Sequence, residues 1–238
     1  MPATVNSRYI LAACSLWLAG CLAVAAAQAG RQLPIDQVPM YGGMDRQAVP
    51  LLKKADEDFI QRTSAAFGGR ERAAATWVEQ GFKFHKAGDL PKAMARFNQA
   101  WLLDPKNPEV YWGFGSVLHD RNEAFAAYDM LKRAYALGFR DAGFLADLGK
   151  VALVRIVERK DLAETQKASF QRESEGFFDE AVKTQKDLGY IYGVWASARY
   201  WQEDYAGAWA KVNLARTHGG VLPPAFLKKL SQKMPEPK

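Results

Sequence analysis

The sequence has little cysteine: its only two cysteines, Cys14 and Cys21, both lie close to the N-terminus. The chain beyond Cys21 therefore has no disulfide, no cysteine nucleophile and no thiolate metal ligand. Histidine is nearly as scarce, with three residues in 238, and the glycine pairs lack the spacing of a phosphate-binding loop. We accordingly expect no catalytic residues, no metal site and no cofactor, which argues against an enzyme.

The sequence also lacks a long run of charge of one sign and any sustained alternation of apolar and polar residues. Its 32 basic and 26 acidic residues give a net charge of +6 and are spread along the chain. This pattern is typical of a solvated surface, and it does not favour nucleic acid as a partner. The missing alternation argues against β-strands, so we expect an all-α protein.

Residues 1–29 have the order of an export signal. A polar start is followed by an apolar run over residues 9–27, after which the sequence turns polar again. Two cleavage sites compete. Residues 18–21, Leu-Ala-Gly-Cys, resemble a bacterial lipobox, which implies cleavage before Cys21 and attachment of lipid to its sulfur. Residues 27–29, Ala-Gln-Ala, instead form an A-x-A site ending at Ala29 that would release a soluble chain.

The complete four-residue match favours lipidation at Cys21, although the apolar run continues beyond it. The residue after the anchor would be Leu22 and not aspartate, which under the bacterial sorting rule implies the outer membrane. We therefore expect an exported, periplasmic protein that is lipid-anchored to the outer membrane. A soluble periplasmic form is the alternative.

Two regions follow the signal: residues 30–50, which are predicted to form an extended tether, and residues 51–238, which are predicted to form a helical domain. The tether contains several residues that break helices and strands, namely Pro34, Pro39, Gly42, Gly43 and Pro50. From Leu51 onward the apolar residues keep a helical spacing.

Residues 77–105 place aromatic and small residues at fixed offsets: Trp77, Gly81, Phe84, Ala93, Phe97, Ala100 and Pro105. Small residues at positions 81 and 93 let two helices approach closely, and the rings fill the volume around that contact. The stretch resembles the tetratricopeptide repeat, a 34-residue unit of two antiparallel helices. The resemblance implies a right-handed α-solenoid built from such helix pairs.

The pattern recurs along the chain. Its position-27 alanine appears as Ala100, Ala134, Ala181 and Ala215. The first two of these alanines are one repeat length apart, and so are the last two, but the middle interval is longer. It contains 13 extra residues, which we place within 138–173 and interpret as a long or irregular first helix followed by a polar insertion over 161–172. Residues 222–233 are amphipathic and are predicted to form a helix that caps the last unit.

In this repeat family the first helices line a groove that holds a segment of a partner, which implies a protein–protein interaction scaffold. Carried onto this sequence, the groove positions include Val78, Phe82, His85, Lys86, Trp112, Ser116, His119, Asp120, Tyr190 and Tyr200. We expect them to contact an unidentified envelope protein or peptide, unless the N-terminal arm or the helix from Leu51 covers the groove. The family's Lys/Asn clamp for a terminal carboxylate is absent, because Val78 and Phe82 occupy its first two places.

His85 and His119 hold the same position in consecutive units. An alternative is therefore an envelope enzyme or a small-molecule carrier with a pocket near these two side chains. Neighbouring helix axes lie about 8–10 Å apart, which is long for two ligands on one metal ion. We therefore favour partner binding over metal binding or catalysis.

Overall fold

The computed structural model of the protein describes residues 37–159 and 161–237. The predicted export signal, with Cys21 and Ala29, lies outside these residues. Within them the secondary structure is helical and includes no β-strand, which confirms the all-α prediction. The elements are η2 (Arg46–Ala48), α2 (Pro50–Phe67), α3 (Arg70–Lys86), α4 (Leu90–Leu103), α5 (Pro108–Asp120), α6 (Ala124–Ala136), α7 (Ala142–Glu158), α8 (Glu164–Lys183), α9 (Leu188–Trp201), α10 (Tyr205–Thr217) and α11 (Pro224–Lys233).

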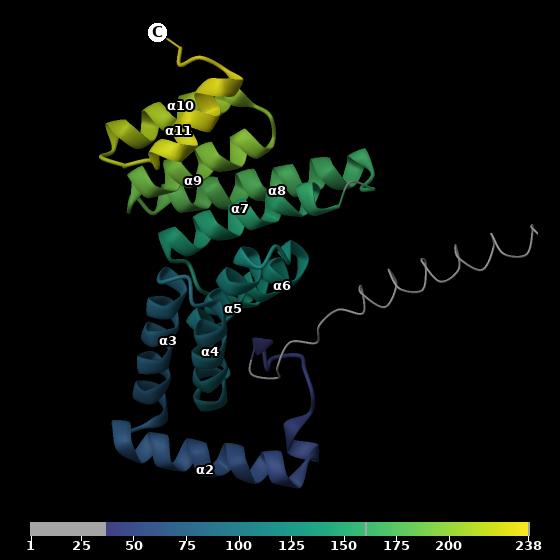
Figure 1. Ribbon diagram of the computed structural model, residues 1–238, viewed down its shortest axis with the longest axis vertical. Helices are drawn as coiled ribbons and strands as arrows, with labels where there is room; N and C mark the ends of the chain where they lie inside the picture. The colour runs from purple at the N-terminus through teal and green to yellow at the C-terminus, as the bar shows by residue number, and fades with distance from the viewer. Residues whose placement is uncertain (1–36, 160, 238) are drawn as a thin grey trace, which may run out of the picture. The chain divides into compact units, whose positions relative to one another are not determined.

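The helices from α3 to α10 form consecutive pairs: α3 with α4, α5 with α6, α7 with α8 and α9 with α10 (Figure 1). Each pair also contacts the next one, chiefly α4 with α5, α6 with α7 and α7 with α9. Neighbouring helix pairs of this kind are expected of an α-helical solenoid. None of the helices in the described part of the chain is long and apolar enough to span a membrane.

The turn inside a pair has the same backbone conformation in three of the pairs. Gly88, Asn122 and Glu203, which hold equivalent positions, have φ angles of 77°, 62° and 61°. In the first and last of these turns an aspartate follows, Asp89 or Asp204, and its carboxylate accepts a hydrogen bond from the amide three residues later. The left-handed residue ends one helix and the aspartate caps the next.

The small residues of the repeated pattern mark the closest approaches between helices. Ala100, Ala134, Ala181 and Ala215 all have no exposed surface. The glycines of the repeated pattern, Gly81 and Gly115, are also tightly enclosed. A Cβ atom on Gly115 would lie 2.6 Å from the side chain of Leu131 in the paired helix. The recurrence seen in the sequence therefore marks equivalent buried contacts.

Phe97 of α4 connects the first two pairs. Its ring is fully buried between α3 and α5. A Cβ atom added to Gly81 would lie 2.5 Å from the ring, and one added to Gly113 would lie 2.2 Å from it. Because real carbon contacts are about 3.5–4.0 Å, only glycine allows the ring to occupy this position.

The 13 extra residues of the third pair lie between Gly149 and Ser174. These two residues correspond to Gly81 and Ala93 of the first pair. α7 extends four residues farther beyond its glycine than α3 or α5 does, the connection is two residues longer, and α8 begins seven residues earlier. The first helix is therefore long, as expected. The predicted polar insertion over 161–172 is mostly helical, since residues from Glu164 onward belong to α8.

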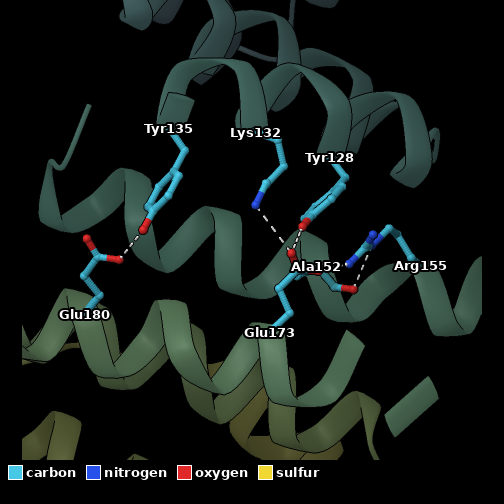
Figure 2. A network of polar contacts seen from close by, with 7 residues as sticks. All are labelled: Tyr128, Lys132, Tyr135, Ala152, Arg155, Glu173 and Glu180. Carbon is cyan, nitrogen blue, oxygen red and sulfur yellow. Dashed lines mark hydrogen bonds and ion pairs between the residues drawn. The ribbon is translucent and has the colours of Figure 1, made fainter. Parts of the chain in front are cut away.

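A network of polar and aromatic contacts fixes this longer pair against α6 (Figure 2). The carboxylate of Glu173 accepts hydrogen bonds from the hydroxyl of Tyr128 and from Nη2 of Arg155, the latter at 2.8 Å, and lies 3.5 Å from Nζ of Lys132. The guanidinium of Arg155 lies 3.5 Å from the centre of the Tyr128 ring. Burial opposes ionisation of Glu173, but these hydrogen bonds outweigh it and lower its pKa.

The described part of the predicted tether, residues 37–49, does not run free. The side-chain amide of Asn98 bonds to the backbone of Val38 and Met40, both at 2.8 Å. The ring of Tyr41 packs edge-on against Tyr111 at 5.0 Å between ring centres. The long-range contacts of Asn98 hold this segment against α4.

The two ends of the array of pairs are both covered. At the first end α2 packs on α3, where the ring of Phe67 lies 6.0 Å from that of Trp77. At the other end α11 packs on α10 and buries Leu230 completely. The residues after α11 are also held, because Nε1 of Trp209 donates to the carbonyl of Met234 at 2.9 Å. The capping helix expected over 222–233 is thus present.

Candidate functional site

A pocket of about 200 Å³ lies between α3, α5, α7 and α9, and we call it the histidine pocket. Five of the ten predicted groove residues line it: His85, Ser116, His119, Asp120 and Tyr190. The other lining residues are Gly115, Leu131, Asp147, Lys150 and Val151. First helices of four different pairs therefore contribute to one small polar site.

His85 and Asp120 form an ion pair across the pocket, linking α3 to the end of α5. Nε2 of His85 lies 2.9 Å from Oδ2 of Asp120. The contact with Asp120 raises the pKa of His85 despite its burial, and the same contact lowers the pKa of Asp120. Each charge of this pair is thus compensated by the other.

Asp147 of α7 is held by two hydrogen bonds from flanking helices. Nε1 of Trp112 donates to one carboxylate oxygen and the hydroxyl of Tyr190 to the other, both at 3.0 Å. Burial raises the pKa of Asp147, and the two donors partly counteract that effect. The carboxylate therefore connects α5, α7 and α9.

The pKa of His119 is lowered, whereas that of His85 is raised. Its Nδ1 is buried without a hydrogen-bond partner among the described residues. Burial lowers the pKa of His119 to about 4, with a smaller contribution from the nearby charge of Lys150. At neutral pH the pocket therefore contains an uncharged imidazole beside the His85–Asp120 pair.

A larger cavity of about 1000 Å³ adjoins the histidine pocket, and we call it the α9 cavity. Its lining comes from α9, from the connections around α9 and α10, and from the start of α11. Leu188, Val194, Leu222 and Phe226 give it apolar walls. Lys150 and Tyr190 line both cavities, so these two side chains stand where the spaces meet.

The other predicted groove residues lie elsewhere. Val78 is 3% exposed and belongs to the core, so it offers no surface to a partner in this structure. Phe82 and Trp112 are half-buried and pack on each other with 4.8 Å between ring centres, because they fill the space between units. Tyr200 packs against Phe226 of α11, at 5.9 Å between ring centres. Lys86 is exposed at the end of α3.

Sequence reasoning missed Asp147 and Lys150. Both follow from counting one repeat length forward, from Gly113 to Asp147 and from Ser116 to Lys150. The long interval between Ala134 and Ala181 obscured this register, since the third unit was located backward from Ala181. The signal was present at Gly149, which continues the series of Gly81 and Gly115.

Residues 37–49, the described part of the arm, and α2 contribute no residue to either cavity. The described residues contain no group of three or more potential ligands that could hold a metal ion. The hydroxyl of Ser116 donates to the carbonyl of Trp112 at 2.9 Å and not to a histidine. The arrangement is suited to binding polar groups through charge and hydrogen bonds.

In comparisons with known proteins, neither a protein-family model nor a curated protein sequence matches this chain.

Proposed function

We propose that this protein is a binding scaffold of the bacterial cell envelope, built as a right-handed solenoid of tetratricopeptide-like units. It is exported and lipid-anchored through Cys21, and it holds a segment of a partner protein along α5, α7 and α9. The observation that carries the proposal is the pair of adjoining cavities on the first helices. Their combined space, with apolar walls at one end and charged groups at the other, suits a peptide segment.

Exposed apolar side chains beside the α9 cavity support the same proposal. Val221 is 96% exposed at its rim, and Tyr190 is 51% exposed where the two cavities meet. Exposed apolar groups next to a recess are typical of a surface that a partner covers.

The proposal is tested by photo-crosslinking in the living bacterium. A photoreactive residue at Ser197, which lines the α9 cavity, is expected to capture a defined protein. The same residue at Lys228, an exposed position on α11, serves as the control. Adding Gly193→Trp places a large side chain in the cavity, where there is room for it because the nearest side-chain atom to a Cβ at this position is 4.0 Å away. The adduct should then disappear; an adduct that survives, or equal capture from both positions, contradicts the proposal.

A small-molecule carrier is the second candidate, and the small polar histidine pocket, which both His85 and His119 line, supports it. Its 200 Å³ would hold only a small polar compound. If the Ser197 probe captures no protein while a small molecule copurifies with the wild type and is lost from the His119→Leu variant, the carrier function replaces the scaffold.

A further inference from the structure

We propose that Lys150 binds the carboxylate of an aspartate or glutamate side chain in the partner segment, at the junction of the two cavities. This inference rests on the proposed scaffold function and specifies the chemistry of the partner. Three features of the site support it: the state of Lys150, the state of its charged neighbours and the shape of the space around it.

Lys150 is a half-buried cation that forms neither an ion pair nor a hydrogen bond with any residue that the structure describes. Lysine is rarely buried unless its charge is paired, because removing the ammonium group from water is costly. The other charged groups lining the histidine pocket each have a partner within 3.0 Å. An external anion would give Lys150 the partner that the fold does not supply.

The charge of Lys150 acts on the two acidic groups of the histidine pocket, Asp120 and Asp147, and favours their ionised forms, but neither carboxylate forms an ion pair with it. Asp120 is paired with His85, and both carboxylate oxygens of Asp147 accept hydrogen bonds. His119 is neutral at pH 7 and adds no second positive charge beside Lys150. A bound carboxylate would therefore meet one available cation without displacing an existing contact.

The position of Lys150 favours a side-chain carboxylate over a chain terminus. The α9 cavity has room for several residues of a peptide, whereas the histidine pocket has room for about one side chain. A peptide lying along the larger cavity would direct one side chain past Lys150 into the smaller pocket. Apolar residues next to that acidic residue would cover Leu188, Val194 and Phe226.

The test is a selection of dodecapeptides displayed on phage as N-terminal fusions, which present no free peptide C-terminus. The target is the purified mature protein, as wild type, Lys150→Glu, Gly193→Trp or the control Lys228→Gln. Wild type and Lys228→Gln should enrich peptides in which an aspartate or glutamate adjoins apolar residues. Lys150→Glu should lose that preference and enrich lysine or arginine at the same place, while Gly193→Trp should enrich neither class.

The best wild-type peptide is then synthesised and titrated against each variant, together with its Glu→Gln or Asp→Asn form. Lys150→Gln should weaken the acidic peptide about tenfold or more and leave the amide form nearly unchanged. The thermal midpoint of each variant, measured by circular dichroism, checks that it is folded. The Lys150-dependent difference should shrink with added salt if the contact is ionic.

The two proposals fail in different ways. Peptides that depend on an open α9 cavity but show no acidic preference, or that bind Lys150→Gln as well as wild type, would overturn the role of Lys150 and leave the scaffold standing. If the selection yields no peptide that distinguishes the wild type from Gly193→Trp, that result contradicts the scaffold function itself.

Discussion

Gly81 and Gly113 face the ring of Phe97, and this packing determines whether alanine at position 113 stabilises or destabilises the protein. Replacing glycine by alanine inside a helix normally stabilises a protein by roughly 0.5–1 kcal/mol, because it restricts the unfolded chain. Gly113 lies inside α5, but its new Cβ would lie 2.2 Å from Cε1 of Phe97 and 2.4 Å from two further ring atoms. The ring cannot move away from it, because Gly81 encloses the opposite side.

We therefore expect Gly113→Ala to destabilise the protein. Overpacking of this kind typically costs about 1–3 kcal/mol, which exceeds the helix gain and leaves a net loss of about 1–2 kcal/mol. Gly176→Ala is the matched control. This glycine also lies inside a helix, α8, but nothing is within 4 Å of the position of its Cβ, so alanine should stabilise there.

The assay is urea unfolding followed by circular dichroism, with Gly113→Ala, Gly176→Ala, Phe97→Leu and the double variant Gly113→Ala/Phe97→Leu. Removing the ring should relieve the overlap, so the double variant should be less destabilised than the sum of its two components. Equal stabilisation by both glycine substitutions, or strict additivity in the double variant, would refute the packing of Phe97 between α3 and α5.

Three further outcomes are expected. Ala100→Glu should cost roughly 3 kcal/mol or more in unfolding free energy, because residue 100 has no exposed surface; little change in thermal midpoint would contradict the repeat register. In NMR titrations His85 should titrate above 6.5 and His119 near 4. Protonated His85 therefore stabilises the fold fully below about pH 6.5, and this stabilisation is lost as pH rises through the folded pKa of His85. Asp120→Asn should lower that folded pKa. Protonation of His119 has the opposite effect and destabilises the fold as pH falls from about 6.5 towards 4. Cys21→Ser should abolish incorporation of labelled fatty acid, and a wild type that incorporates none would favour cleavage after Ala29.

Short-range spacing predicted the helix pairs, because the residues that set them are close in sequence. Gly115 and Ala127 meet across one turn, where a Cβ on Gly115 would lie 3.1 Å from the carbonyl oxygen of Ala127. The recurrence of the repeated pattern was enough to predict where Ala181 and Ala215 are buried. The docking of the N-terminal arm could not be predicted, since it depends on Asn98 bonding to backbone some 60 residues away. Composition alone described that segment as a tether.

The candidate site was predictable in part for the same reason. Groove positions follow the repeat count, and in the first two units that count found His85, Ser116 and His119. The count failed in the third unit, because both Lys150 and the 13 extra residues come after Gly149 in the sequence. How far the predicted aromatic side chains stay accessible could not be deduced either, because Phe82 and Trp112 are half-buried against each other and Trp112 also packs on Phe139.

The longer α7–α8 pair shows that the spacing of these units is independent of the length of their hairpins. The additional residues also contact the preceding unit, since Glu158 accepts a hydrogen bond from the amide of Phe125 and the ring of Phe170 lies 6.3 Å from that of Phe125. The buried alanines Ala134 and Ala181 nevertheless continue the repeated pattern on either side. The longer hairpin therefore enlarges the contact between the second and third units, and its distal end lies away from the α7 residues that line the cavities, Asp147, Lys150 and Val151. A fluorescent or affinity tag grafted after Glu158 would report on the full-length protein while leaving both cavities intact.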